Sequence, residues 1–143
     1  MTDGTENASA TGGVAVVIVA AGRGARAGQA NGPKQYQNIG GRAVIAHTLE
    51  MFLAHPRTGR IVVAIHADDH ELFRQAAGAQ AQRVTAIIGG PTRQESVRLG
   101  LLALKDHAPG QVLIHDAVRP FVDAELIDRT IAAIGENEGA LPA

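Results

Sequence analysis

Four short apolar runs alternate along the chain with amphipathic segments. The runs are rich in valine and isoleucine, and they span 14–21, 61–65, 84–88 and 112–115. The first run carries no polar side chain at all. Runs of this kind are typical of central strands in a parallel sheet, which are covered on both faces. The pattern therefore predicts four buried strands.

Helical periodicity fills the intervals between these runs. Ile45 and Leu49 begin a series of apolar residues that repeats at the spacing of one helical face. Similar stripes predict helices over 69–77 and 94–105. We expect a last helix from Asp123, whose side chain can accept hydrogen bonds from the free amides of the first turn.

This alternation predicts an α/β protein with an open, mainly parallel sheet and helices on both faces, in a Rossmann-like arrangement. In such a sheet, ligands bind beyond the carboxyl ends of the strands. Three segments that follow strands carry unusual residues, namely 20–26, 89–93 and 115–119. We expect them to converge on one crevice.

Composition and charge narrow the class of protein. The 143 residues fit one domain, and a net charge of -1 offers no general surface for nucleic acid. The chain has no cysteine, which excludes disulfides and thiolate catalysis. The apolar runs are too short to span a membrane, and no signal peptide is visible, so we expect a cytoplasmic location and no membrane partner. Residues 1–13 are small and polar and predict a disordered tail ahead of a domain at 14–143.

The loop after the first strand has the composition of a phosphate site. Gly22 and Gly24 match the start of a dinucleotide fingerprint, but glycines and a proline within 28–33 interrupt the helix that this fingerprint requires. No Gly-Lys-Ser/Thr motif exists for a Walker loop. What remains is a loop of small residues with two cations, Arg26 and Lys34, that can wrap a triphosphate. Two ordinary surface cations are the structural alternative.

Two further loops carry candidate chemistry. Gly89 and Gly90 precede a helix that bears Arg93 and Ser96, although a plain strand-to-helix turn explains the glycines equally well. Asp116, at the end of the fourth strand, can hold Mg²⁺ bridged to substrate phosphates, because this ion needs only one or two protein carboxylates. An aspartate that caps a turn is the alternative there.

A second group of polar residues has the composition of a metal site. His66, Asp68 and His70 lie close together in the sequence. We favour a structural interpretation, in which Asp69 caps a helix and both histidines are exposed. No serine lies in a nucleophile elbow, so nothing supports a hydrolytic triad.

Taken together, the motifs resemble those of the 2-C-methyl-D-erythritol 4-phosphate cytidylyltransferases of the non-mevalonate isoprenoid pathway. The resemblance runs from about Val14 to the last residue. The motifs that carry it are Ala20-Ala21-Gly22-x-Gly24-x-Arg26, Pro33-Lys34-Gln35-Tyr36, Gly89-Gly90-x-x-Arg93-x-x-Ser96-Val97 and His115-Asp116-Ala117-Val118-Arg119-Pro120.

The resemblance implies a nucleotidyltransferase that moves CMP from CTP to a polyol phosphate with Mg²⁺ and releases pyrophosphate. It implies that Arg26 and Lys34 stabilise the transition state. It implies that Asp116 binds the metal and a substrate hydroxyl, and that Arg119 binds the polyol phosphate. The nucleotide-binding residues that it implies are Ala20, Ala21, Gly22, Gly24, Gly90, Arg93, Ser96 and Ala117.

Two departures from the family pattern qualify this expectation. Pro91 stands where a polar side chain could help to read the base, so that contact must come from the backbone or be absent. The family continues past the equivalent of Ala143 into further strands, a dimerisation arm and basic residues. We therefore expect 14–143 to be a domain incomplete at its C-terminal side, within a homodimeric protein, and one interpretation is a bifunctional protein fused to a later pathway enzyme. The alternatives are a ribitol- or glycerol-phosphate cytidylyltransferase, a non-catalytic CTP-binding fragment, and a purely structural domain.

Overall fold

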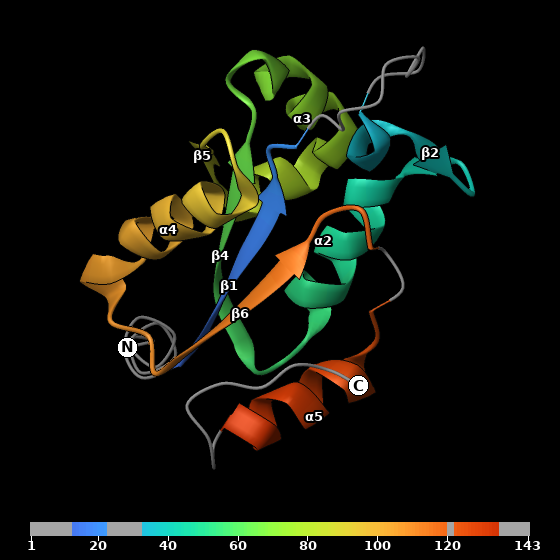
Figure 1. Ribbon diagram of the computed structural model, residues 1–143. Coiled ribbons are helices and arrows are strands. Elements are labelled where there is room, and N and C mark those ends of the chain that lie inside the picture. The colour runs from blue at the N-terminus through green and yellow to red at the C-terminus, as the bar shows by residue number, and fades with distance from the viewer. Residues whose placement is uncertain (1–12, 23–32, 120–121, 135–143) are drawn as a thin grey trace.

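The computed structural model describes residues 13–22, 33–119 and 122–134, and a parallel sheet forms its centre (Figure 1). The strands lie in the order β5-β4-β1-β6, and every neighbouring pair is parallel. This confirms the predicted open parallel sheet and gives β1 a central place. The bounds of the strands are β1 (Val14–Ala20), β4 (Thr58–Ile65), β5 (Thr85–Ile88) and β6 (Gln111–Asp116).

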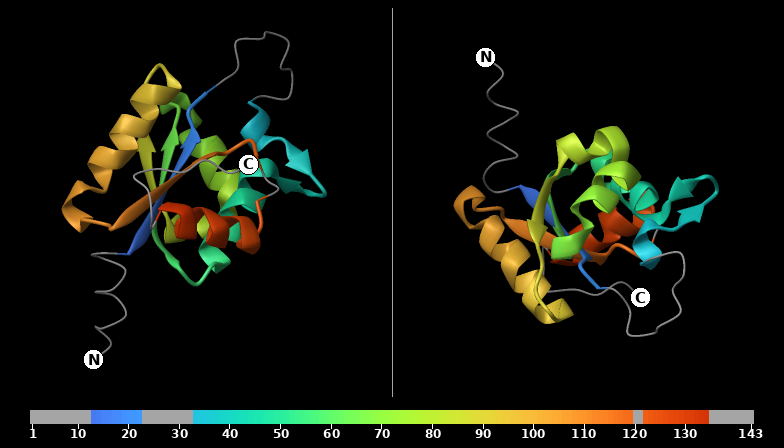
Figure 2. Two further views of the ribbon diagram at one scale, coloured as in Figure 1. Left: turned by 60° about the horizontal axis from the view of Figure 1, so that its bottom comes forward. Right: turned by 90° about the horizontal axis from the view of Figure 1, so that it is seen from above.

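Helices cover both faces of the sheet, as predicted (Figure 2). Three of them, α2 (Val44–Ala54), α3 (His70–Ala77) and α5 (Ala124–Ile134), pack on one face, and α4 (Arg93–Ala103) packs on the other. Short 3₁₀ helices link several elements: η1 (Lys34–Tyr36), η2 (Ala67–Asp69), η3 (Gly78–Arg83) and η4 (Lys105–His107). No helix in the described ranges is long and apolar enough to cross a membrane.

The alternation of side chains along β1 divides the core into two layers. Val16 and Ile18 face the larger layer, which also holds the apolar stripes of α2, α3 and α5. Ala15 and Val17 face the smaller layer beneath α4. All four side chains are nearly fully buried. The strand is therefore apolar throughout because neither of its faces meets water.

The ends of some elements differ from the sequence pattern. Strand β4 begins at Thr58, ahead of the apolar run at 61–65, because backbone pairing with β1 continues past the buried side chains. A small antiparallel hairpin, β2 (Asn38–Ile39) and β3 (Arg42–Ala43), was not predicted. Its strands are two residues long and mostly exposed, so the hydrophobic pattern does not reveal them. The glycines of the turn are the only sequence signal for the hairpin. Both turn glycines have positive φ, at 64° and 86°.

The start of the last helix is confirmed at Asp123. Its Oδ1 accepts a hydrogen bond from the amide of Leu126 at 2.8 Å, as an N-cap does. The predicted tail at 1–13 falls outside the described residues apart from Gly13, so its disorder stays a prediction.

Gly100 lets α4 approach β1 closely. A Cβ at this position would lie 2.6 Å from Cγ1 of Val17, which is closer than real side chains come. Helix propensity alone predicts that Gly100→Ala stabilises the protein by about 1 kcal/mol. We expect the opposite sign, a loss of about 1–3 kcal/mol in the free energy of unfolding, because α4 must move off the sheet. Denaturant unfolding measures the change, and a gain in stability would contradict this packing.

Candidate functional site

The loops after the strands meet at the carboxyl edge of the sheet, as the sequence predicts. The amide of Gly89, just past β5, donates to the carbonyl of Ile65 at the end of β4 at 2.8 Å. The amide of Ala117, just past β6, donates to the carbonyl of Val19 in β1 at 2.9 Å. These two hydrogen bonds continue the pairing of the parallel strands by one residue, past the end of β5 and past the end of β6. The described parts of all three predicted segments therefore lie at one edge.

A buried glutamine anchors the end of β1. The side-chain nitrogen of Gln35 donates to the carbonyl of Ala20 at 2.7 Å and to that of Gly22 at 2.9 Å. Ala20 and Ala21 are buried, whereas Gly22 is exposed. The sequence pattern gives Gln35 no role of its own. Its only signal is its place in the family motif Pro33-Lys34-Gln35-Tyr36.

Lys34, which precedes Gln35 on η1, is held near the end of β1 by these bonds. Its side chain is exposed, and it forms no ion pair with any residue that the structure describes. An exposed ammonium group at this edge is available to an anionic ligand. Arg26 and Gly24 lie outside the described residues, so their roles stay predictions.

The glycines after β5 are required by close packing. A Cβ on Gly89 would lie 2.7 Å from both Cβ of Ala21 and Oγ of Ser96, and one on Gly90 would lie 2.5 Å from Cβ of Glu95. The loop therefore lies directly against the start of α4 and the end of β1. This close packing accounts for both glycines structurally, and a contact of Gly90 with a nucleotide stays a prediction.

Ser96 fixes this glycine loop from the first turns of α4. Its hydroxyl is buried and accepts a hydrogen bond from the amide of Gly90 at 3.0 Å. The hydroxyl of Thr92 caps the same helix by accepting from the amide of Glu95 at 3.1 Å. Ser96 thus shapes the loop from within, and its direct contact with a nucleotide stays a prediction.

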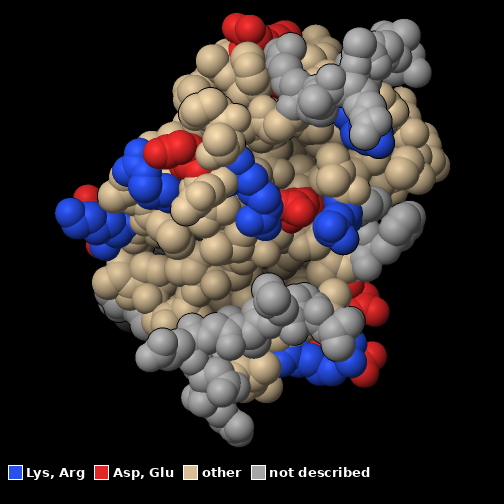
Figure 3. All heavy atoms as spheres, viewed as in Figure 1, with Lys and Arg blue, Asp and Glu red and all other residues tan. Residues whose placement is uncertain are grey.

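An ion-pair cluster surrounds Asp116 at the end of β6. Nε of Arg93 donates to Oδ1 of Asp116 at 2.9 Å, and Nε of Arg119 lies 3.5 Å from Oδ2. Pairs as exposed as these stabilise a fold by only about 0–1 kcal/mol. Their main effect is to hold two guanidinium groups beside one carboxylate, which leaves a net positive charge at this edge. In Figure 3, basic and acidic side chains alternate across the middle of the visible face.

The donor set at Asp116 fits a magnesium site of the kind that substrates complete. Asp116 supplies one carboxylate, and its Oδ2 is the oxygen with the longer ion pair. Magnesium keeps most of its waters and takes its other ligands from substrate phosphates. Arg93 and Arg119 would then lie beside those phosphates. The cluster therefore suits a metal that arrives with a nucleotide better than a preformed metal centre.

His115 supports the turn that carries Asp116. Its Nε2 lies 2.7 Å from the carbonyl oxygen of Arg119, and because a carbonyl only accepts, Nε2 carries the proton. The ring meets Phe52 edge-on, with 5.2 Å between centroids. Burial lowers the pKa of His115, and the hydrogen bond to Arg119 and the charge of Asp116 oppose that shift.

The pH dependence of stability follows from this shift. Because the unfolded chain binds the proton more tightly, the free energy of unfolding is expected to fall as the pH drops below about 6.5, and to level off below the pKa of the folded state. Denaturant unfolding between about pH 7.5 and 5 measures this trend. In His115→Gln the trend is expected to flatten, and an unchanged slope in that variant would contradict the assignment.

A buried threonine on α2 also holds this turn. The hydroxyl of Thr48 lies 3.3 Å from the carbonyl of Ala117 and is fully buried. Both the amide and the carbonyl of Ala117, the residue expected at the ribose, are therefore engaged within the protein. The sequence signal for Thr48 is a polar residue on the apolar stripe that contains Ile45.

The residues around His66 were predicted to have structural roles, with Asp69 capping α3. The predicted capping hydrogen bond is not formed. Asp69 is fully buried, but its side chain makes no capping hydrogen bond to α3. His66 instead accepts a hydrogen bond from the amide of Asp68 at 3.0 Å, and it is only partly exposed, whereas His70 is exposed as expected. Within the described ranges, no three His, Asp or Glu side chains are grouped so as to hold a metal ion.

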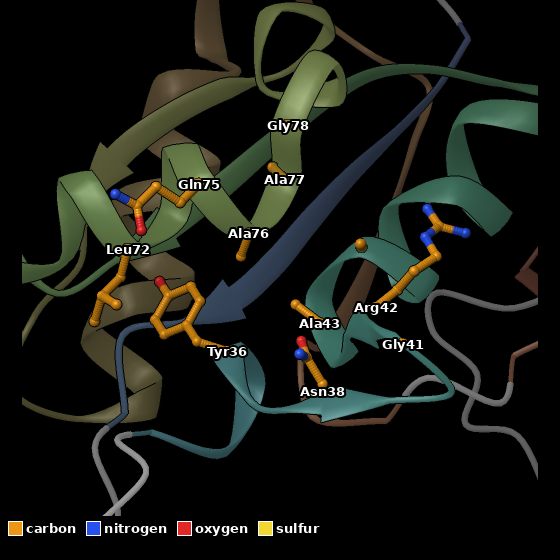
Figure 4. Close-up of a pocket in the computed structure, with 11 residues that line it drawn as sticks. Tyr36, Asn38, Gly41, Arg42, Ala43, Leu72, Gln75, Ala76, Ala77 and Gly78 are labelled. Carbon is orange, nitrogen blue, oxygen red and sulfur yellow. The ribbon is translucent and has the colours of Figure 1, made fainter.

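A separate pocket of about 470 Å³ lies beside η1, between the β2–β3 hairpin and α3 (Figure 4). Tyr36, next to Gln35 on η1, lines it together with Leu72 and Gln75 of α3. The sequence pattern does not predict this pocket, because residues from six elements form it: η1, β2, β3, α2, α3 and η3. Of the three residues of η1, Tyr36 lines this pocket, whereas Lys34 and Gln35 do not.

Fold and site together define a nucleotidyltransferase-like α/β domain, with three loops and a basic cluster at the carboxyl edge of a parallel sheet. The family model described as "IspD: 2-C-methyl-D-erythritol 4-phosphate cytidylyltransferase" matches residues 14–143. The chain belongs to this family.

Curated relatives and solved structures agree with this family. The chain is 93% identical over its whole length to "Bifunctional enzyme IspD/IspF" of Mesorhizobium japonicum, and covers 35% of that enzyme. Over 91% of the chain it is 52% identical to the enzyme of the same name from Rhodospirillum rubrum, of which it covers 34%. A crystal structure of 4-diphosphocytidyl-2C-methyl-D-erythritol synthase from Anaerococcus prevotii matches 88% of the chain and 52% of its own, with a TM-score of 0.72 and 29% identity. The chain thus spans about a third of the length of these curated relatives.

Proposed function

We propose that this domain binds CTP with Mg²⁺ at the carboxyl edge of its sheet and transfers CMP to 2-C-methyl-D-erythritol 4-phosphate. The observation that carries the proposal is the meeting of three loops there, with Arg93, Asp116 and Arg119 in one cluster and Lys34 exposed nearby. Membership of the family supports the choice of substrates. We further propose that the intact protein is a cytoplasmic homodimer.

The reaction needs positioning and charge stabilisation more than a protein nucleophile. A phosphate oxygen of the polyol phosphate attacks the α-phosphorus of CTP, and the bond from that phosphorus to the bridging oxygen breaks. Pyrophosphate leaves with the electron pair. Lys34 and Arg26 neutralise charge that builds up on the transferring phosphoryl group and on the leaving group.

The remaining residues bind and orient the reactants. Asp116 would hold Mg²⁺, which clamps the phosphates and neutralises their charge when it is bound. Arg119 would then pair with the phosphate of the polyol, in place of its long contact with Asp116. The Gly89–Gly90 backbone, fixed by Ser96, would face the cytidine, which compensates for the absence of a polar side chain at Pro91.

A panel of phosphate acceptors tests the proposal. The intact protein is incubated with CTP, Mg²⁺ and, in separate reactions, methylerythritol phosphate, ribitol phosphate or glycerol phosphate, and pyrophosphate release is followed. We expect release with methylerythritol phosphate at a kcat/KM at least about tenfold above the other two. Preference for ribitol or glycerol phosphate would reassign the substrate, and CTP binding without any release would favour a non-catalytic domain.

A further inference from the structure

Gln35 joins the two ends of the predicted phosphate loop. It directly follows Lys34, and its side-chain nitrogen donates to the carbonyls of Ala20 and Gly22 on the far side of that loop, at 2.7 and 2.9 Å. A side-chain amide has two N–H groups, so both are used here. With 3% of its surface exposed, Gln35 is almost fully buried.

These bonds fix the direction of a backbone amide. The peptide between Ala20 and Ala21 is trans, so its carbonyl and its N–H point in opposite directions. Because the carbonyl of Ala20 points to Gln35, the amide of Ala21 points away from it. The same side chain sets how far Lys34 stands from that amide. One residue thus couples a backbone donor and a cation that would act on the same triphosphate.

We propose that Gln35 is a positioning residue for nucleotide binding and transfer, acting through the Ala21 amide and the ammonium group of Lys34. The inference rests on the proposed function. A purely structural role would instead affect folding alone, as expected of Thr58, whose single hydroxyl proton is shared between two carbonyl oxygens, those of Phe52 and His55, at the opposite end of the sheet. Thr58 is therefore a matched control.

The experiment compares Gln35→Met with Thr58→Val in the intact protein. Both variants lose a side-chain donor that bonds backbone carbonyls while keeping the side-chain size, so both are expected to be less stable. Only Gln35→Met is expected to lower kcat/KM for CTP, by roughly 10- to 100-fold, because the two groups that bind the triphosphate shift relative to each other. A value for Gln35→Met within about twofold of Thr58→Val would overturn the proposal.

Hydrogen exchange separates this proposal from the proposed function. Gln35→Met is expected to speed amide exchange at 20–22 and 34–36, next to its contacts with Ala20 and Gly22, whereas Thr58→Val, at the far end of the sheet, leaves those segments unchanged. If the wild-type protein does not turn over CTP, the proposed function fails, and equal exchange in the two variants would overturn the role of Gln35 as well.

A second variant covers the case in which Gln35→Met does not fold. In Gln35→Glu the carboxylate can only accept at neutral pH, but once protonated it donates one hydrogen bond. Burial beside two carbonyl oxygens raises the pKa of a carboxyl group at this position, so we expect the defect in CTP affinity, relative to wild type, to shrink between about pH 8 and 5. A defect that stays constant over this range would contradict the positioning role of Gln35.

Discussion

Replacement of Lys34 by alanine is expected to lower kcat for CTP-dependent pyrophosphate release by about 10²- to 10³-fold. The ammonium group is exposed at the edge of the site and forms no ion pair with the described residues, so its charge is available to the phosphates. For the same reason the free energy of unfolding is expected to change by less than about 0.5 kcal/mol. Steady-state kinetics and thermal unfolding measure the two effects.

Lys105→Ala is the matched control for this variant. Lys105 is another exposed lysine on a 3₁₀ helix, but η4 lies near the start of β6, at the opposite edge of the sheet. Its replacement is expected to leave kcat unchanged. Arg26→Ala, predicted from the sequence alone, is expected to behave like Lys34→Ala. Full activity in Lys34→Ala would remove that residue from the catalytic machinery.

Asp116→Asn is expected to lower kcat by roughly 100-fold and to raise the Mg²⁺ concentration for half-maximal activity at least about tenfold. The change removes the carboxylate charge from between Arg93 and Arg119 while keeping the size of the side chain. Titration of activity with Mg²⁺ measures both effects. Because the ion pairs are largely exposed, we expect a loss of no more than about 1 kcal/mol in stability.

Asp106→Asn serves as the control, since Asp106 is an exposed aspartate on η4, away from the site. It is expected to leave both the turnover and the Mg²⁺ requirement as they are in wild type. A normal Mg²⁺ dependence in Asp116→Asn, with reduced turnover, would show that Asp116 orders the two arginines without binding the metal.

The fold was predictable from the sequence wherever burial is continuous. The apolar run of β1 and the stripe that starts at Ile45 have lengths and periods that only a central strand and a covered helix explain. The β2–β3 hairpin has mostly exposed two-residue strands, so hydrophobicity gives it no signal. The amino end of β4 at Thr58 is formed by backbone pairing alone, which composition does not reveal.

The site was predictable in its location but not in its contacts. Parallel topology brings the loops after β1, β5 and β6 to one edge, whatever their sequences. The hydrogen bond from Gln35 to Ala20 spans 15 residues, and that from Arg93 to Asp116 spans 23. Such contacts depend on how the loops are set by α4 and η1 against the sheet, and no local pattern encodes them.

The central claim is tested most directly by following the α-phosphorus of CTP by phosphorus NMR in the presence of the intact protein, Mg²⁺ and methylerythritol phosphate. The account predicts that the α-phosphorus appears in a diphosphate linkage to the polyol, with one pyrophosphate formed for each CTP consumed. Recovery of the α-phosphorus as free CMP, or of intact CTP, would contradict transfer at this site.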